Sequence, residues 1–292
     1  MLEMPKPDLV ICHANCTDGF AASWAVYRRY GNESEYLPMS HGSEPPLDKI
    51  SGKKVLFVDF SYKYNQMVKI IEASDSTWVV DHHVTAKDDL ARLNGTSGFG
   101  SFFDMDKSGA VLAWEAVHEA PAPPILRYVQ DRDLWKWELP NSKEVSAFLD
   151  SYKMDFSLWN DFHKSCFHPT GDSGHRVDYR VVQDGRAILR AKAIQVENLA
   201  KKAESWEILG VKVPVVNTPV MMSEVGAALS PGQPFSATYF ESKGKRIWSL
   251  RSEPNGLDVS EVATYFGGGG HKHASGFMSL PTETTDLHRS KE

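Results

Sequence analysis

The sequence predicts an α/β fold, with a parallel-sheet N-terminal domain and a smaller α/β C-terminal domain joined by a long linker helix. Three short apolar segments, 8–14, 54–60 and 77–81, have the length and composition of buried strands. Segments of helical periodicity separate them, and this alternation is typical of a parallel sheet with crossover helices. A chain of 292 residues is long enough for two domains, each with its own core.

Helices are expected between and after these strands. The clearest helical segments are 20–31, 64–74 and 108–120. A Pro-rich break at 120–124 precedes a further helix, which carries Asp131 and Asp133. Residues 151–184 are rich in His, Asp, Gly and aromatic side chains and show no clear periodicity, so they receive no assignment.

One long helix at 185–205 is expected to join the two domains, because its apolar positions recur at helical spacing. Three strand-like segments follow it, at 211–217, 235–241 and 246–251. The expected division is therefore a catalytic domain at 1–184, the linker helix, and a substrate-binding domain at 206–285. The polar residues at the end of the sequence are expected to fray.

Composition and charge limit the class of partner. The formal net charge is −6, from 32 basic and 38 acidic residues. Proteins that bind long nucleic acid usually carry a basic surface, so we expect a short substrate held in a pocket and no long nucleic acid. No apolar run approaches the length of a membrane-spanning helix, and the start lacks a signal-peptide pattern, so a cytoplasmic protein without a membrane partner is expected. The three cysteines are too few and too unevenly placed for a disulfide framework.

Acidic and imidazole residues follow the ends of the predicted strands. The three strands end at His13, Asp59 and Asp81, and functional groups gather beyond the carboxyl ends of parallel strands. The turns nearby add Asp18, His82, His83 and Asp131. A lone strand-end aspartate is more often a turn or cap residue, but several together favour a metal site. Mixed carboxylates and imidazoles suit manganese, iron or zinc, and two such ions suit hydrolysis at phosphorus.

Five motifs occur along the chain in the order that they have in the DHH superfamily of phosphoesterases. They are CHANCTDGFAA from Cys12, VDFS from Val58, the DHH triplet from Asp81, KSGAVLAWEAV with QDRDLW from Lys107 and Gln130, and FGGGGHKHASGF from Phe266. The sequence therefore resembles this superfamily over roughly residues 8–280, including a DHH-associated C-terminal domain with a GGGH motif. Its size is similar to that of the nanoRNase and cyclic-dinucleotide phosphodiesterase group. The related RecJ-type exonucleases carry strand-binding domains for which this chain has no room.

The resemblance implies a set of metal ligands. These are His13, Asp18, Asp59, His82 and Asp131, with Asp59 as the bridging carboxylate. Asp133 is the alternative to Asp131. Asp81 would be a further ligand or would orient its neighbours, and His83 would contact the substrate phosphate. The implied cofactor is a pair of divalent ions, manganese in the first place, with zinc, iron or magnesium as alternatives.

The first motif departs from the family at Cys16, where an aspartate is usual. A thiolate suits zinc or iron better than manganese. Four interpretations stay open. Cys16 binds a softer metal, or one metal site is weakened, or Asn15 or a water takes the place of the missing ligand, or Cys16 only packs.

The glycine-rich segment supplies most of the expected substrate-binding residues. Four successive glycines let a backbone approach a ligand closely and point N–H groups at anionic oxygens, although most glycine runs are only flexible loops. A helix starting at Ala274 would add a phosphate-binding N-terminus. Ser108 is either a helix N-cap or a further phosphate donor. The expected substrate-binding set is Arg251, Gly268, Gly269, Gly270, His271 and Ser108. The resemblance implies that Arg251 and His271 hold the substrate phosphate or a terminal nucleotide.

The favoured function is a metal-dependent phosphodiesterase of the 3′–5′ exonuclease type. It would hydrolyse short oligonucleotides, or cyclic or linear dinucleotides, to mononucleotides. Two alternatives stay open: a bisphosphonucleotide phosphatase or pyrophosphatase/exopolyphosphatase, and an inactive nucleotide-binding protein, which only Cys16 favours. The GGGGH motif argues against the DHH pyrophosphatases, which end in a different domain. A homodimer is also left open.

Overall fold

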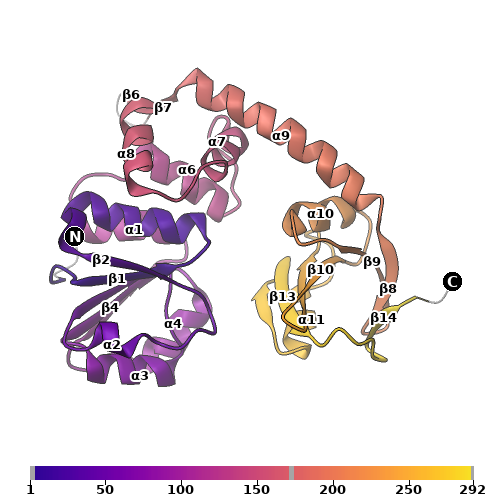
Figure 1. Cartoon of the computed structure of the whole chain (residues 1–292), viewed down its shortest axis with the longest axis horizontal. Helices are drawn as coiled ribbons and strands as arrows, with labels where there is room; N and C mark the ends of the chain where they lie inside the picture. Colours follow the sequence, from indigo (N-terminus) through magenta and orange to yellow (C-terminus); the bar gives the residue numbers. More distant parts are fainter. Residues whose placement is uncertain (1–3, 171–173, 291–292) are drawn as a thin grey trace. The chain divides into compact units, whose positions relative to one another are not determined.

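The computed structural model describes residues 4–170 and 174–290. The chain divides into two compact units, Met1–Ile188 and Leu189–Glu292, each with its own sheet (Figure 1). The α/β class is confirmed, since one sheet is parallel and the other mostly antiparallel. The functional roles expected of 1–184, 185–205 and 206–285 stay predictions. No helix within the described ranges is long and apolar enough to cross a membrane.

A five-stranded parallel sheet lies at the centre of the first unit. In spatial order its strands are β2 (Glu35–Met39), β1 (Leu9–His13), β3 (Lys54–Val58), β4 (Ser76–Asp81) and β5 (Phe99–Phe103). The three predicted strands are confirmed as β1, β3 and β4. Strands β2 and β5 were not predicted, because these edge strands are only partly buried and lack a continuous apolar run. Strand β2 also contains Pro38.

Helices cover both faces of this sheet. The helices of the first unit are α1 (Thr17–Tyr30), α2 (Leu47–Ile50), α3 (Tyr64–Ala73), α4 (Val84–Leu90), α5 (Gly109–Val117), α6 (Pro124–Asp133), α7 (Ser142–Asp150) and α8 (Phe156–Ser165), with short 3₁₀ turns at Gly31–Glu33 and Ala91–Leu93. Side chains alternate along each strand, so Val10 and Cys12 pack in the core formed with α1 and α5, while Leu9 and Ile11 pack with α3. Figure 1 shows α1 over one face of the sheet and α2 and α3 over the other.

The segment without an assignment contains regular structure. Residues 151–184 include α8, the antiparallel pair β6 (Phe167–Thr170) and β7 (Gly174–Val177), and the first turn of α9 (Tyr179–Ala200). The predicted range 185–205 for the long helix is therefore wrong at both ends. The helix ends early because Trp206 and Ile208 alternate into the second core as part of a strand.

A seven-stranded sheet forms the second unit. In spatial order its strands are β12 (Gly269–His271), β13 (Ala274–Ser279), β11 (Lys245–Arg251), β10 (Ser236–Ser242), β9 (Val211–Asn217), β8 (Glu204–Ile208) and β14 (Leu287–Arg289), with helices α10 (Met222–Leu229) and α11 (Val259–Tyr265). The strands predicted here are confirmed as β9, β10 and β11. A helix starting at Ala274 is wrong, because Ala274 begins β13 and pairs with Arg251. The expected fraying is wrong for Leu287, which is buried and pairs with Ile208.

Candidate metal centre

The strand-end residues of the first unit lie together at the carboxyl edge of its sheet. His13 ends β1, Asp59 follows β3 directly and Asp81 ends β4, and these three strands are neighbours. Three overlapping groups have possible ligand atoms within 4.8 Å of one another: His13, Cys16 and Asp59; Asp18, His82 and Asp133; and Asp59, Asp81, His82 and His83. The fold thus brings residues that are distant in sequence together in one cluster.

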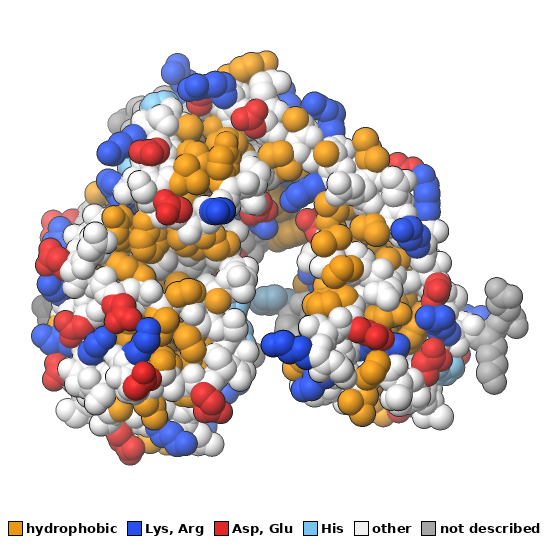
Figure 2. All heavy atoms as spheres, in the orientation of Figure 1, with side chains coloured by type: hydrophobic (Ala, Val, Ile, Leu, Met, Phe, Trp, Pro, Cys, Tyr) orange, Lys and Arg blue, Asp and Glu red, His pale blue; other side chains and the backbone are white. Residues whose placement is uncertain are grey.

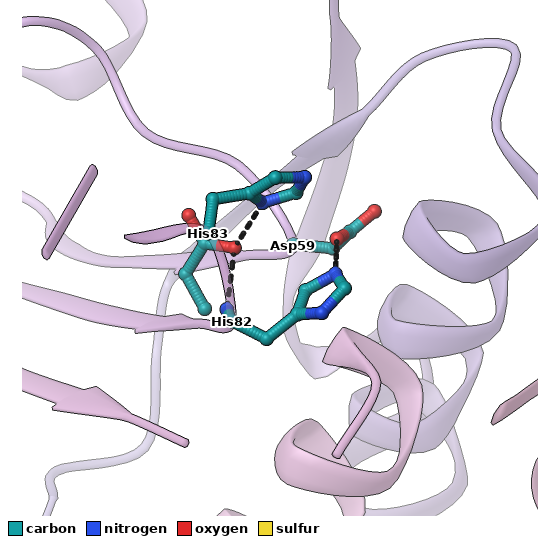
Figure 3. A group of neighbouring side chains, drawn as sticks. Asp59, His82 and His83 are labelled. Carbon is teal, nitrogen blue, oxygen red and sulfur yellow. Dashed lines mark hydrogen bonds and ion pairs between the residues drawn. The ribbon is translucent and has the colours of Figure 1, made fainter. Parts of the chain in front are cut away.

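Asp59 lies where these groups meet. Its backbone φ is 52°, in the left-handed region that aspartate tolerates better than most residues and that is often found at functional sites. One carboxylate oxygen, Oδ2, lies 3.9 Å from Nδ1 of His13 and 3.7 Å from Sγ of Cys16. The other, Oδ1, lies 3.2 Å from Nε2 of His82, and the two side chains point toward each other in Figure 3. The two oxygens of Asp59 therefore face two different sets of ligand atoms.

Negative charge is concentrated in this cluster. Burial, followed by the nearby Asp18 and Asp81 carboxylates, raises the pKa of Asp59 well above its ordinary value. Burial and Asp18 likewise raise the pKa of Asp133 to about 7. Oδ1 of Asp59 is buried and accepts no hydrogen bond from the described part of the chain. A buried carboxylate oxygen without a hydrogen-bond donor is costly unless a cation offsets its charge, so these residues fit a divalent metal ion.

Asp18 is held by the N-terminus of α5. Its two oxygens accept hydrogen bonds from the backbone N–H groups of Gly109, at 2.7 Å, and Ala110, at 3.1 Å. A Cβ atom at position 109 would lie 2.5 Å from Cβ of Asp59, so only glycine fits there. Gly109 was not among the predicted site residues. Its only mark in the sequence is the Ser-Gly pair at the start of a helix, and that pair by itself indicates no more than a helix N-cap.

The contacts of Asp131 and Asp133 differ, and they bear on which of the two could hold a metal ion. Asp131 is buried, and its oxygens accept hydrogen bonds from the backbone N–H groups of Glu138, at 3.0 Å, and Leu139, at 3.2 Å. It thereby holds the turn that follows α6. Asp133 instead lies 3.5 Å from Nε2 of His82. The geometry favours Asp133, and Asp131 is absent from the candidate ligand groups among the described residues.

Asp81 orients both histidines of the DHH triplet. Its Oδ1 atom accepts a hydrogen bond from the backbone N–H of His82, and Nδ1 of His83 lies 2.7 Å from the same oxygen. The hydrogen bond to Asp81 raises the pKa of His83, which favours the imidazolium that a phosphate contact needs. Of the two roles considered for Asp81, the contacts favour orientation.

Cys16 lies beside Asp59 but bears a proton in the metal-free chain. Burial, and then the charge of Asp59, raise the pKa of its thiol to about 12. The same residue is the N-cap of α1, yet its side chain makes no capping hydrogen bond there. Its position leaves ligation possible, because a bound cation would reverse the effect of the surrounding carboxylates on the thiol.

The expected substrate-binding residues fall into two places. Ser108 is fully buried and caps α5 by accepting a hydrogen bond from the Val111 N–H, which favours the N-cap alternative. Arg251 and His271, in the second unit, end β11 and β12 and both pair with Ala274 of the strand between them. Gly268, Gly269 and Gly270 of the same segment are exposed, as is Gly267 before them. The guanidinium of Arg251 donates hydrogen bonds to Ser223, Ser249 and the Leu250 carbonyl.

Comparison with known proteins gives alignments with solved structures and with a relative in sequence, each over most of the chain. No family model matches the chain. Among solved structures, an uncharacterized protein from Helicobacter pylori G27 aligns over 97% of this chain and 94% of its own, with a TM-score of 0.44 and 16% identity. The pGpG-specific phosphodiesterase PggH from Vibrio cholerae (94% and 93%, TM-score 0.49, 11% identity) and an exopolyphosphatase-related protein from Bacteroides fragilis (95% and 88%, TM-score 0.48, 11% identity) align similarly.

The chain also has a relative in sequence. The uncharacterized protein R106 of Acanthamoeba polyphaga mimivirus is 32% identical to this chain over an alignment 307 residues long. The alignment covers 96% of this chain and 70% of the relative. The chain therefore belongs to the family of this mimivirus protein.

Proposed function

We propose that the protein is a metal-dependent phosphoesterase that hydrolyses short phosphodiesters, such as oligonucleotides of a few residues, to mononucleotides. The observation that carries the proposal is the placement of Asp59, whose Oδ2 faces His13 and Cys16 while Oδ1 faces His82. A carboxylate that divides its oxygens between two ligand sets suits a bridge between two metal ions. The DHH motif, with its resemblance to a phosphoesterase superfamily, supports the same reading.

The proposed ligand set follows the contacts. One ion would be held by His13, Cys16 and Asp59, and the other by Asp18, Asp59, His82 and Asp133. Divalent ions in such a set supply hydroxide at neutral pH and offset the charge that develops on the phosphoryl oxygens.

The remaining roles belong to the protein's own groups. Asp81 holds the His83 ring in place, and protonated His83 would bind a non-bridging phosphate oxygen. Hydrolysis forms a bond between phosphorus and the oxygen of water and breaks the bond to the leaving oxygen, which takes up a proton. Arg251, the glycine segment and His271 remain proposed substrate contacts of the second unit.

The preference for short substrates rests on charge. The net charge of the chain is −6. On the face that Figure 2 shows, acidic and basic side chains are interspersed over the first unit and form no continuous basic patch. Binding to long nucleic acid depends on many phosphate contacts, which such a surface does not favour.

The experiment is a parallel assay of a linear dinucleotide, a cyclic dinucleotide, a bisphosphonucleotide, pyrophosphate and a long single strand, each with manganese, zinc or magnesium. We expect turnover of the dinucleotides with manganese and none with a chelator. The Asp59→Ala variant should lose activity, while Asp75→Ala, at an exposed aspartate outside the cluster, should keep it. Activity limited to pyrophosphate, a preference for the long strand, or no metal-dependent turnover at all would contradict the proposal.

A further inference from the structure

A cavity of about 180 Å³ adjoins the candidate metal centre within the first unit. Segments that follow β2 and β3, together with residues of α3 and α4, line it. Asp81 and His83 belong both to its lining and to the metal-binding group of the DHH triplet. The cavity and the candidate metal centre therefore adjoin each other at these two residues.

The cavity is lined by hydrogen-bond donors that the protein itself does not use. The side chains of Ser61, Lys63 and Gln66 make no hydrogen bond or ion pair with any residue in the described ranges. Lys63 stands at the start of α3, and Gln66 lies on the same helix one turn later. One cationic donor and two neutral donors are thus available to a ligand along one wall.

The two carboxylates in the lining are already engaged. Asp81 accepts hydrogen bonds from its two neighbouring histidines. Asp89 accepts one from the Tyr64 N–H at 2.7 Å and one from Arg92 at 3.2 Å. Neither carboxylate forms an ion pair with Lys63, so the positive charge of the ammonium group is left for a ligand.

Aromatic rings form the back of the cavity. Phe60 and Tyr62 are almost fully buried, and the His41 ring lies 5.0 Å from the Phe60 ring. Packed rings give this wall a fixed shape. The donors at positions 61, 63 and 66 therefore surround a preformed space, as expected of a binding site.

We propose that this cavity binds a second phosphoryl group of the substrate, next along the chain from the ester that is hydrolysed. Lys63 supplies the charge, and Ser61 and Gln66 donate to the phosphoryl oxygens. The inference rests on the proposed function and narrows its substrate class to nucleotides that carry two phosphates, such as a 5′-phosphorylated dinucleotide.

The first test compares hydrolysis of two adenosine dinucleotides, with and without a 5′-terminal phosphate. We expect the wild-type kcat/KM to be about 10-fold or more higher for the phosphorylated substrate, because the added phosphate would form charge-assisted hydrogen bonds in the cavity. Lys63→Gln should bring this ratio close to one. The matched control is Lys69→Gln, an exposed lysine of α3 outside the cavity, which should leave the ratio and both rates unchanged.

The second test separates this inference from the proposed function. Equilibrium binding of the same two dinucleotides is measured by calorimetry with the metal removed by a chelator. Tighter binding of the phosphorylated ligand, lost in Lys63→Gln but not in Lys69→Gln, supports the cavity even if the protein hydrolyses neither compound. Hydrolysis and binding of both dinucleotides without preference, or a preference that survives in Lys63→Gln, would overturn the inference and leave the phosphoesterase intact.

Discussion

Nε2 of His82 lies 3.2 Å from Oδ1 of Asp59, a buried carboxylate oxygen that accepts no hydrogen bond from the described residues. The second residue of the DHH triplet and the aspartate after β3 thus direct ligand atoms at each other in a site rich in carboxylates. This relationship favours a cation between them, and the stability of the protein can be used to detect it.

Asp59→Asn should affect the metal-free and metal-bound protein in opposite directions. Without metal, the change removes a buried acidic group whose charged form is disfavoured by burial and by the Asp18 and Asp81 carboxylates, so it should raise the free energy of unfolding by about 1–3 kcal/mol. With manganese, the wild type should gain stability that the variant does not, because ligand binding to the native state stabilises it. Thermal melts with chelator and with added metal measure both effects. Equal loss of stability in the two conditions would show Asp59 to be a purely structural residue.

Asp133→Asn should mainly weaken metal binding, whereas Asp131→Asn should mainly lower the stability of the fold. Asp133 contacts His82, so its substitution should weaken metal binding by about 10-fold or more while the fold is kept. Asp131 accepts two backbone hydrogen bonds, so its substitution should lower the free energy of unfolding by about 1–3 kcal/mol, with a smaller effect on metal affinity. Calorimetric metal titration and chemical denaturation of both variants distinguish the two. The reverse pattern would restore Asp131 as the ligand.

Cys16 can be tested by the spectrum of bound cobalt. If its sulfur joins His13 and Asp59 in one site, cobalt(II) should show a thiolate charge-transfer band that Cys16→Ser abolishes. Cys16→Asp should shift the preference from zinc toward manganese. Cys166→Ser, at a cysteine outside the cluster, is the control. An unchanged cobalt spectrum in Cys16→Ser would leave Cys16 with a packing role only.

Gly109→Ala should disable the site without changing any ligand. The added methyl group would collide with Cβ of Asp59 and with Oδ2 of Asp18, and the N-terminus of α5 would have to move. We expect a loss of about 1–3 kcal/mol in unfolding free energy and a loss of metal-dependent stabilisation. Gly95→Ala offers a contrast, because its added methyl group would meet nothing within 4 Å, although its positive φ adds some strain. Full metal binding by Gly109→Ala would show that the α5 terminus is not needed to position Asp18.

The sequence by itself determined the alternation of strand and helix, three of the five parallel strands, and the gathering of His13, Asp59 and Asp81 at one edge. These features follow from local apolar runs and from the rule that parallel strands end at the same edge. The edge strands β2 and β5 and the bounds of α9 could not be predicted from the sequence, because they depend on partial burial and on pairing between distant segments.

Only the tertiary structure shows the contacts that bear on the choice between Asp131 and Asp133, on the two roles of Ser108, and on ligation or orientation by Asp81. Each interpretation depends on which groups lie within hydrogen-bonding or ion-pair distance of a carboxylate or hydroxyl oxygen in the folded chain, and the pattern of residue types does not give these distances. It also revealed Gly109 and the Lys63 cavity, since a close approach between helices and strands leaves no mark in local composition.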